Sequence, residues 1–435
     1  MTALAYHRLQ KGWDLRPLKH IAALNPEVLP EDTDPGWTFP YVDIGNVTFE
    51  AGITGTELVR FADAPSRARR RVRNGDTIVS TVRTYLRAIA PVSNQPDGLI
   101  ASTGFAVVRA KPPTNAGYLS WALRSSTFVE AVVADSVGVS YPAIAPSVLG
   151  ALPVPVPPPA EQHAIADFLD RETAKIDALI ATQERLIALL DEKRQATITH
   201  AVTKGLDPDA PMKESGVEWL GEVPVEWDIK PLKFLFLVRG GATPSKDELA
   251  YWNGGIPWVT PKDMKIPVIS TTEDTVSPQA LSDGRLSMLP TGAILVVVRG
   301  MILAKRVPIA ETSNPVTINQ DMKALIFKAS GVPAFFRYFL SACAGIFDGL
   351  IEEAGHGTKT LRTDWLGRIA LPAPSASEQE AIVRYLDSSL EQFDRLTRQS
   401  TEVTERLRER RTALITAAVT GQIDVSRPAI TEAAE

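Results

Sequence analysis

The stretch AEQHAIADFLD at residues 160–170 recurs in the same chain as SEQEAIVRYLD at residues 377–387. Six of the eleven residues are identical, and the offset between the copies is 217 in a chain of 435 residues. Upstream, WDLRPLK at 13–19 corresponds to WDIKPLK at 227–233. Self-similarity at a fixed offset is a primary indication of how a chain is organised. The sequence therefore predicts a tandem duplication of about 215 residues, long enough for a globular domain and a connecting segment in each copy.

Each copy ends in a segment that predicts one long helix. Proline-rich boundaries, LPVPVPPPAEQ and LPAPSASEQ, lead into residues 161–204 and 378–420, which contain neither proline nor glycine. Proline lacks a backbone donor and restricts the residue before it, so each helix is expected to begin just after its boundary. Gly205 and Gly421 follow the two segments, where glycine commonly ends a helix.

Apolar residues recur at steps of three, four or seven along both segments, which is the spacing of a coiled-coil seam. The predicted seam comprises Ile165, Leu169, Ile176, Leu179, Leu186 and Leu190 in the first segment, and Ile382, Leu386, Phe393, Leu396, Val403, Leu407 and Leu414 in the second. Two equal helices, each leading out of its own domain, can bury these seams against each other as an antiparallel pair. A homodimer with a four-helix bundle would bury the same residues, and the sequence leaves both arrangements open.

The rest of each copy predicts short strands. Apolar runs at 76–82, 104–110, 292–298 and 323–329 are bounded by Asn-Gly, Pro-Thr-Gly and proline-rich turns, the usual punctuation of strands. The predicted fold class is α+β: two α/β domains separated by two long antiparallel coiled-coil helices, with a pseudo-two-fold internal repeat. The predicted boundaries are residues 1–150 for the first domain, 151–206 for the central helical spacer, 207–367 for the second domain, and 368–435 for the distal helical spacer with the C-terminal tail.

Composition is that of a globular protein, with 44% hydrophobic and 22% charged residues. The net charge of −5 neither favours nor excludes nucleic acid, because a basic face can form locally. The longest apolar run, AILVVV at 293–298, is too short to span a membrane, and a single Cys343 fits a reducing compartment, so we expect a cytoplasmic protein. The histidines are too far apart to predict a metal site. They are His7, His20, His163, His200 and His356.

Three segments carry a resemblance to a known family. They are EKRQATITHAVTKGLDPDAPMKESGVEWLGEVPVEWDIKPLK at 192–233, GGATPSKDELAYWNGGIPWVTPKDM at 240–264 and GHGTKTLRTDWLGRIALPAPSASEQ at 355–379. With the duplicated Glu-Gln helix start, they resemble the specificity subunit of type I restriction-modification systems over essentially the whole chain. The first copy departs from the pattern, because it lacks a counterpart of most of residues 212–226.

The resemblance implies two target-recognition domains, residues 1–150 and 207–367, each of which reads one half of a bipartite, asymmetric site on double-stranded DNA. It implies no catalysis and no bound cofactor in this chain. Two modification subunits, methyltransferases that use S-adenosylmethionine, would dock on the helical regions and methylate adenine. The full restriction complex would add two ATPase-nuclease subunits, which use ATP and Mg and cleave unmodified DNA.

The residues themselves predict no catalytic site. No Asn/Asp-Pro-Pro-aromatic motif points to a methyltransferase, and neither a Gly-x-Ser-x-Gly elbow nor a His-Glu-x-x-His helix occurs. GHGTKT at 355–360 resembles a phosphate loop only superficially, because it lacks the four-residue gap and the leading strand of that motif. We expect this stretch to form an ordered turn ahead of the second helix.

The strongest candidate for DNA contact is SRARRRVRNGD at 66–76, which holds five arginines. Arginine suits phosphate and bidentate guanine contacts, although a solvated turn would also explain the run. In the second domain the cations are scattered around the loop YWNGGIPW, and its tryptophans could instead be core residues. The candidate DNA-binding residues are Arg67, Arg69, Arg70, Arg71, Arg73, Arg83, Arg87, Tyr41, Lys246, Trp258, Lys262, Arg299, Lys305, Arg306, Lys359 and Arg362.

The outward faces of the two helices are either solvated or a docking surface for a partner. Small side chains allow another helix to approach closely, so the candidate docking residues are Ala196, Ala201, Ala417 and Ala418. A second class of function stays open, a coiled-coil scaffold or regulatory protein that presents two protein-binding domains. Closely matched helices beside divergent domain interiors favour two different DNA readers on one scaffold.

Overall fold

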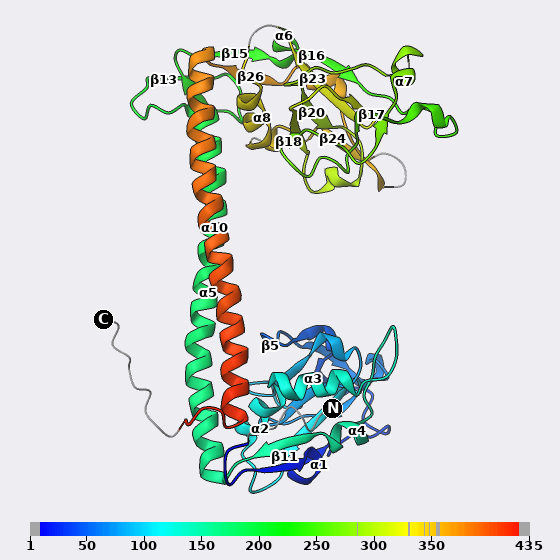
Figure 1. The fold of residues 1–435 in the computed structure, drawn as a ribbon, viewed down its shortest axis with the longest axis vertical. Coiled ribbons are helices and arrows are strands. Elements are labelled where there is room, and N and C mark those ends of the chain that lie inside the picture. The colour runs from blue at the N-terminus through cyan, green and yellow to red at the C-terminus, as the bar shows by residue number, and fades with distance from the viewer. Residues whose placement is uncertain are drawn as a thin grey trace. The chain divides into compact units, whose positions relative to one another are not determined.

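The computed structural model divides the chain into two compact units (Figure 1). The first unit comprises residues up to Arg185 together with those from Thr401 onward, and the second comprises Leu186–Ser400. The structure describes residues 9–284, 286–328, 331–342, 344–347, 349–353 and 357–425. His7, Cys343 and His356 lie outside these ranges. None of the described helices combines the length and the apolar character that crossing a membrane requires.

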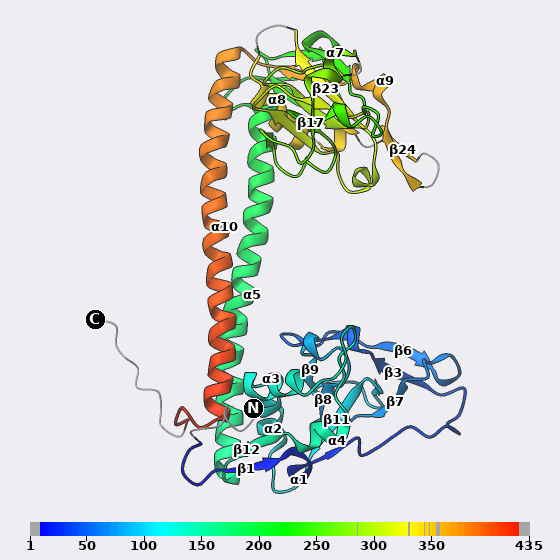
Figure 2. The same cartoon turned by 45° about the vertical axis from the view of Figure 1, so that its right-hand side comes forward.

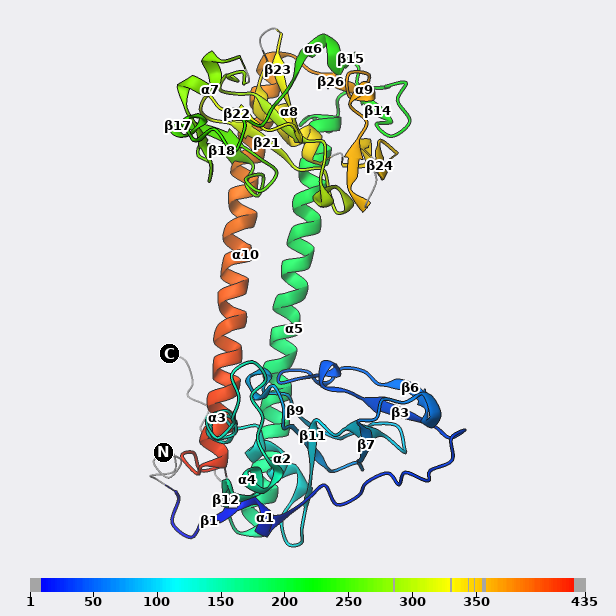
Figure 3. The same ribbon diagram turned by 90° about the vertical axis from the view of Figure 1, so that its right-hand side faces the viewer.

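The first unit contains two four-stranded sheets, in the orders β6-β3-β10-β7 and β2-β11-β8-β9. Figure 3 shows β3, β6 and β7 gathered on one side of the unit. The strands are β1 Asp14–Pro17, β2 Ala22–Leu24, β3 Thr38–Val42, β4 Val47–Thr48, β5 Gly52–Ile53, β6 Glu57–Arg60, β7 Ala68–Arg71, β8 Thr77–Ser80, β9 Ile89–Pro91, β10 Ile100–Ser102, β11 Phe105–Ala110 and β12 Pro153–Val156. The helices are α1 Leu18–Ile21, α2 Ala116–Leu123, α3 Ser126–Ala134 and α4 Pro146–Ala151, with 3-10 turns η2 Ile44–Asn46, η3 Phe61–Asp63 and η4 Thr84–Leu86.

The predicted strands of the first unit are confirmed and form its centre. β8 and β11 pair antiparallel, with Phe105 opposite Ser80 and Val108 opposite Thr77. All four residues of β8 are buried, because sheet and helices cover both of its faces. β1 pairs with β12 just ahead of the long helix, so the two ends of the domain segment are joined by one ladder.

The second unit is built around a five-stranded sheet in the order β16-β23-β20-β21-β18, beside a three-stranded sheet β19-β17-β22. The strands are β13 Met212–Glu214, β14 Glu222–Pro224, β15 Asp228–Pro231, β16 Phe236–Gly240, β17 Trp252–Val259, β18 Val268–Ile269, β19 Thr275–Val276, β20 Ile294–Val297, β21 Ile309–Thr312, β22 Thr317–Ile318, β23 Met322–Phe327, β24 Ile351–Glu353, β25 Lys359–Leu361 and β26 Ala370–Ala373. The helices are α6 Leu232–Leu235, α7 Pro278–Ser282, α8 Pro333–Ala342 and α9 Thr363–Leu366, with 3-10 turns η5 Leu249–Tyr251, η6 Met301–Ala304 and η7 Ala344–Phe347. Figure 2 shows the β24–β25 hairpin at the periphery of this unit.

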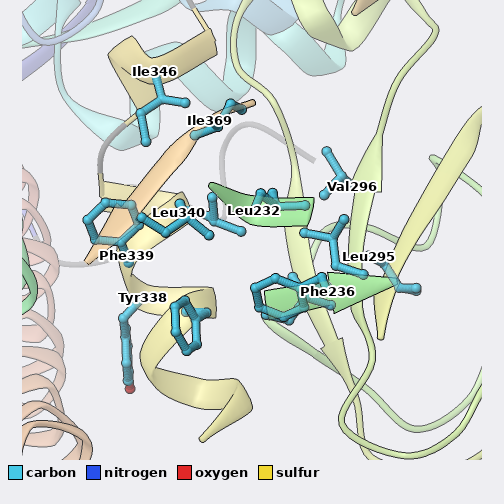
Figure 4. Close-up of a cluster of buried hydrophobic side chains, with 14 of the residues drawn as sticks. Leu232, Phe236, Leu295, Val296, Tyr338, Phe339, Leu340, Ile346 and Ile369 are labelled. Carbon is cyan, nitrogen blue, oxygen red and sulfur yellow. The ribbon is translucent and has the colours of Figure 1, made fainter. Parts of the chain in front are cut away.

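The core of the second unit packs α8 against the five-stranded sheet (Figure 4). Leu295 and Val296 of β20 are fully buried beside Phe236 of β16 and Phe339 of α8. Burying one such side chain contributes roughly 1.5–3 kcal/mol. The alternation of aromatic and branched residues therefore fixes the position of the helix over the sheet.

The two long helices are confirmed as α5 Pro159–Lys204 and α10 Ala376–Val419. Each begins at its proline boundary, and the glycines that follow have left-handed backbones, with φ of 79° at Gly205 and 72° at Gly421. In the first unit Arg411 donates to Asp177, with Nε to Oδ1 at 2.8 Å, and Arg408 donates to Glu184 at 2.9 Å. Residue numbers along α10 fall as those along α5 rise across these contacts, as between antiparallel helices.

The predicted seam is wrong in the middle of both helices. Leu179 is 52% exposed and Leu186 41% exposed, while Leu396 and Val403 are 44% and 42% exposed. The buried line instead passes through polar residues. They are Thr173 of α5, with 3% exposure, and Ser400 and Thr404 of α10, with 6% and 5%. Apolar residues at three- and four-residue steps fall on two adjacent helix faces. Spacing alone does not show which face is buried, and in the middle of these helices the predicted face is exposed.

Candidate nucleic-acid interface

The repeated Glu-Gln pair attaches each long helix to its own globular segment. In the first unit, Trp13 donates its indole Nε1–H to Glu161 at 2.8 Å. Gln162 accepts from the backbone N–H of Asn115 at 2.8 Å and donates to the carbonyl of Pro157 at 2.8 Å. Since Gln162 is 2% exposed, its amide satisfies two backbone groups in a dry environment. We call this arrangement of hydrogen bonds the helix clamp.

The second unit repeats the helix clamp. Trp227 donates to Glu378 at 2.8 Å, and Gln379 accepts from Val332 N–H at 3.0 Å and donates to Pro374 O at 2.8 Å. The sequence predicts Glu161, Gln162, Glu378 and Gln379 as first-turn residues of the helices but does not predict their partners. The repeated WDxxPLK motif could have indicated them, since its tryptophan supplies the indole donor in each copy.

A second duplicated cluster joins each domain to its long helix about three turns beyond the helix start. Trp121 donates to Asp170 at 2.7 Å, and the Arg124 guanidinium stacks 3.6 Å from the Trp121 ring. Burial, with a smaller contribution from the charge of Arg411, lowers the pKa of Arg124 to about 10. Asp170, and less strongly Asp177, offset part of this effect, and Asp177 is itself bound by Arg411.

In the second unit, Tyr338 takes the position of Trp121 at the offset of 217. Its hydroxyl donates to Asp387 at 2.6 Å, and the guanidinium of Arg337 lies 4.1 Å from its ring. Burial raises the pKa of Tyr338, and the hydrogen bond to Asp387 raises it further. Arg194, which corresponds to Arg411, pairs with Asp394.

The arginine run does not form one basic surface, because β7 distributes its side chains. Arg69 is half-buried, with its guanidinium 5.0 Å from the Phe61 ring. Arg70 is half-buried too, and burial lowers its pKa. Only Arg67 and Arg71 among the run's first four arginines are exposed. Arg71 is the last residue of β7, and Arg67 precedes its first residue.

Arg73 belongs to an ion-pair network that the sequence does not predict. Arg109 on β11 donates to Asp76 at 2.7 and 2.8 Å and to Glu27 at 2.5 Å. Arg73 binds the same Glu27 carboxylate at 2.5 Å. The hydrogen bonds that Arg109 donates to Asp76, and the one it donates to Glu27, raise the pKa of Arg109, and Arg109 lowers the pKa of Glu27. This network neutralises Arg73 and stabilises the sheet.

Two aromatic candidates for base stacking are buried in this structure. Tyr41 is 4% exposed within β3, and burial raises the pKa of its hydroxyl. Trp258 is 6% exposed within β17, donates to Ala242 O at 3.1 Å and packs edge-on against Trp252. Both residues point into small aromatic cores, so these predictions were wrong.

The cations of the second unit differ in how strongly carboxylates hold them. Lys262 is bound by Glu273 and Asp274, both at 2.9 Å, and the hydrogen bond to Asp274 raises its pKa most. Lys359 pairs with Glu353 at 2.6 Å, and Arg362 contacts Glu352 and Asp364. The remaining candidates are exposed: Lys246, Arg299, Lys305 and Arg306.

A family model described as the type I restriction modification DNA specificity domain matches residues 12–188 and 224–406. The chain belongs to this family. Each match covers one copy of the duplication and ends inside the long helix of that copy. Membership of the specificity-domain family thus applies to both halves of the chain.

Two relatives are specificity subunits of type I restriction enzymes. The EcoR124I/EcoR124II specificity subunit of Escherichia coli is 31% identical over 255 residues, which is 58% of this chain and 57% of the relative. The MjaIX specificity subunit of Methanocaldococcus jannaschii is 34% identical over 182 residues, 40% of each chain. The matched part of this chain thus spans about half the length of these relatives.

Solved structures share the fold of this chain. One is a chain from a structural study of complex assembly and conformational transition of the type I R-M system, with a TM-score of 0.75 and 23% identity over 96% of this chain and all of that chain. The HsdS subunit from Thermoanaerobacter tengcongensis gives a TM-score of 0.56 and 23% identity over 96% of this chain and 99% of that chain. The likeness at this identity concerns the fold.

Two of the four candidate docking residues are also buried. Ala201 is 1% exposed in the core of the second unit, and Ala418 is 0% exposed in the core of the first, so their prediction as outward residues was wrong. Each lies near the helix end, where its own domain covers the face. Ala196 is exposed and Ala417 is half-buried. Within the described ranges, no group of three or more His, Cys, Asp or Glu side chains could hold a metal ion.

Proposed function

We propose that this chain is the DNA sequence-specificity subunit of a type I restriction-modification complex and performs no catalysis itself. The observation that carries the proposal is the family match, once in each copy, at residues 12–188 and 224–406. Each copy would read one half of a bipartite, asymmetric site. Partner subunits would methylate adenine at that site and cleave it when it is unmodified.

The duplication suggests how two readers are held apart. Residues 1–150 and 207–367 would be the target-recognition domains, and 151–206 and 368–435 the helical spacers. We infer that α5 and α10 form an antiparallel coiled coil that sets the distance between the half-sites. Half-site spacing follows from such geometry in DNA-binding proteins generally.

Exposed cations without strong carboxylate partners are the best candidates for DNA contact. They provide phosphate and guanine contacts, whereas a cation held by two carboxylates, such as Lys262, is already neutralised. The candidates retained on this ground are Arg67, Arg71, Arg83 and Arg87 in the first unit, and Lys246, Arg299, Lys305 and Arg306 in the second.

The partners would be two methyltransferase subunits and, in the full complex, two ATPase-nuclease subunits, acting in the cytoplasm. Exposed apolar residues at matching places on the two helices support paired docking. Leu179 of α5 corresponds to Leu396 of α10, and Leu186 corresponds to Val403, at the offset of 217. All four are more than 40% exposed, which is unusual for large apolar residues at repeated positions.

Methylome sequencing tests the proposal. The chain is co-expressed with its modification subunit in a host that lacks other adenine methylation, and the host genome is sequenced with base-modification detection. We expect methylated adenine within one split, asymmetric motif, and none when the modification subunit is expressed alone. An assembled complex that produces no new motif would refute the proposal and favour a scaffold function.

A further inference from the structure

Two neighbouring segments of the first unit present an exposed patch of arginine, aromatic and branched side chains. One is the η4 turn between β8 and β9, and the other joins α3 to α4, which extends as a loop at the edge of the unit in Figure 1. Tyr85 is 53% exposed, Val137 81%, Val139 102% and Tyr141 66%. The reading patch, as we name it, comprises Arg83, Tyr85, Leu86, Arg87, Val137, Val139 and Tyr141.

The backbone beneath the reading patch is firmly attached to the core. Val82 and Val137 both form β-bridges with Ala143, and Ile144 donates to Thr81 O at 2.9 Å. The buried Thr84 hydroxyl, from within η4, donates to Ser136 at 2.8 Å. The two segments therefore hold one fixed arrangement, which a surface that discriminates between ligands requires.

Both arginines of the reading patch have left-handed backbones. Arg83 has φ 50° and ψ 47°, and Arg87 has φ 53° and ψ 30°. Such conformations cost a residue other than glycine of order 1 kcal/mol each, and they concentrate at functional sites. At the offset of 217, Gly300 occupies the place of Arg83, with φ 140°. Arg83 thus occupies a backbone conformation that glycine adopts more easily.

The charge of the patch is not neutralised within the unit. Residues 81–88 and 136–143 contain no acidic side chain. In the described part of the chain, neither Arg83 nor Arg87 forms an ion pair, and the Arg83 guanidinium instead lies 5.0 Å from the Tyr141 ring. Arg73 and Arg109, by contrast, are bound by carboxylates. Oriented guanidinium groups beside exposed apolar side chains match the edges of base pairs in the major groove, where guanine accepts from arginine and thymine presents a methyl group.

We propose that the reading patch contacts the base edges of the first half-site, with Arg83 as a specificity-determining residue and Tyr141 as the residue that orients it. The inference rests on the proposed function and extends it to named side chains. The second unit has the same backbone bridge, Arg299 to Thr360 in place of Val82 to Ala143, but carries Gly300 and the exposed Met301 on the corresponding turn. One frame with different side chains suits two different half-sites.

Arg83→Gly and Arg87→Gly test the inference without a folding penalty, because glycine favours the left-handed backbone. The matched control is Arg16→Ala, which removes another exposed arginine of the first unit. Once the methylome has revealed the motif, the assembled methyltransferase complex is titrated with duplexes that carry the intact site, a scrambled first half-site or a scrambled second half-site.

We expect Arg83→Gly to lower discrimination against the scrambled first half-site by about ten- to a hundred-fold, as loss of a bidentate base contact does, and to leave discrimination at the second half-site unchanged. Three results would overturn the inference. The variants could behave like Arg16→Ala, they could lose both half-sites equally, or they could fail to retain the modification subunit while still reading both half-sites. A wild-type complex without any split motif would instead refute the proposed function itself.

Discussion

The two units share their helix clamps but differ at two matching interior positions, which carry an ion pair in the first unit and apolar side chains in the second. At the offset of 217, Asp76 and Arg109 of the first unit correspond to Ala293 and Ile326 of the second. Asp76 is 2% exposed and ion-paired, while Ala293 is 1% exposed in an apolar core. The shared frame therefore accepts either a buried ion pair or an apolar pair, provided that both partners change together. The frame and the interior of each domain are specified separately.

Substituting one partner of the buried ion pair gives the largest expected effect. Arg109→Ile leaves the Asp76 carboxylate buried and unpaired, which should destabilise the first unit by about 3–5 kcal/mol. Asp76→Ala/Arg109→Ile, the residue pair found in the second unit, should recover most of that loss. Hydrogen exchange of the β8 and β11 amides measures the first unit selectively. If the double variant destabilises the first unit as much as Arg109→Ile alone, the two residue pairs are not interchangeable in the shared frame.

Removing the clamp amide should cost both units equally. Gln162→Leu leaves the Asn115 N–H and the Pro157 carbonyl unsatisfied in a buried site, and Gln379→Leu does the same in the second unit. Unpaired buried groups cost about 1–3 kcal/mol each, so the two groups left unpaired should cost roughly 2–6 kcal/mol in either variant. Hydrogen exchange of β11 and β23 reports the two units, and Gln399→Leu on an exposed helix face is the control. A loss confined to one unit would show that the clamps are not equivalent.

The sequence was sufficient for features that depend on local pattern. The duplication, both long helices and the four predicted strands follow from repetition, proline boundaries and apolar runs, and the structure confirms them. The face on which a helix packs was not predictable in the same way. The exposed Leu179 and the half-buried Ile180 are neighbours in sequence, about 100° apart around the helix axis. Both are apolar, so the sequence does not show which of them faces the partner helix.

The candidate site was predicted only in part, because burial depends on tertiary packing. Tyr41 and Trp258 occupy corresponding strand positions that face aromatic cores, and Arg109 finds Asp76 across 33 residues of sequence and Glu27 across 82. Arg83 and Arg87, which we propose as members of the reading patch, were among the predicted DNA contacts because arginine is itself a signal. Tyr85, Val139 and Tyr141 were missed, since exposure of an apolar residue leaves no trace in a single sequence.

Truncating the aromatic hydrogen-bond donors should destabilise the two units to different extents, with a smaller effect than the preceding variants. Trp121→Phe removes the hydrogen bond to Asp170 and weakens the stacking of Arg124, whereas Tyr338→Phe removes only the hydrogen bond to Asp387. A hydrogen bond to a charged group contributes about 1.5–3 kcal/mol, and cation–π stacking adds about 0.5–1 kcal/mol. We therefore expect Trp121→Phe to destabilise its unit more than Tyr338→Phe destabilises the other. Hydrogen exchange measured during thermal unfolding tests this order. The opposite order would mean that Arg124 is stabilised mainly by Asp170 and Asp177.

Acidification should affect the first unit through Glu27. Leu24 pairs with Val108 as Val238 pairs with Leu325, which places Gly241, a residue without an ionisable group, at the matching position of the second unit. Arg109, and less strongly Arg73, hold the pKa of Glu27 below its ordinary value of 4.5. A carboxyl whose pKa is lower in the folded than in the unfolded state contributes its full stabilisation above the unfolded value and loses it as the pH falls through the folded value. The first unit should therefore lose protection of the β11 amides as the pH falls below about 4.5, and Glu27→Gln should reduce this dependence. The effect should be small, because Glu27 is solvated, and an identical pH dependence in wild type and Glu27→Gln would show that Glu27 is not the source of the acid sensitivity.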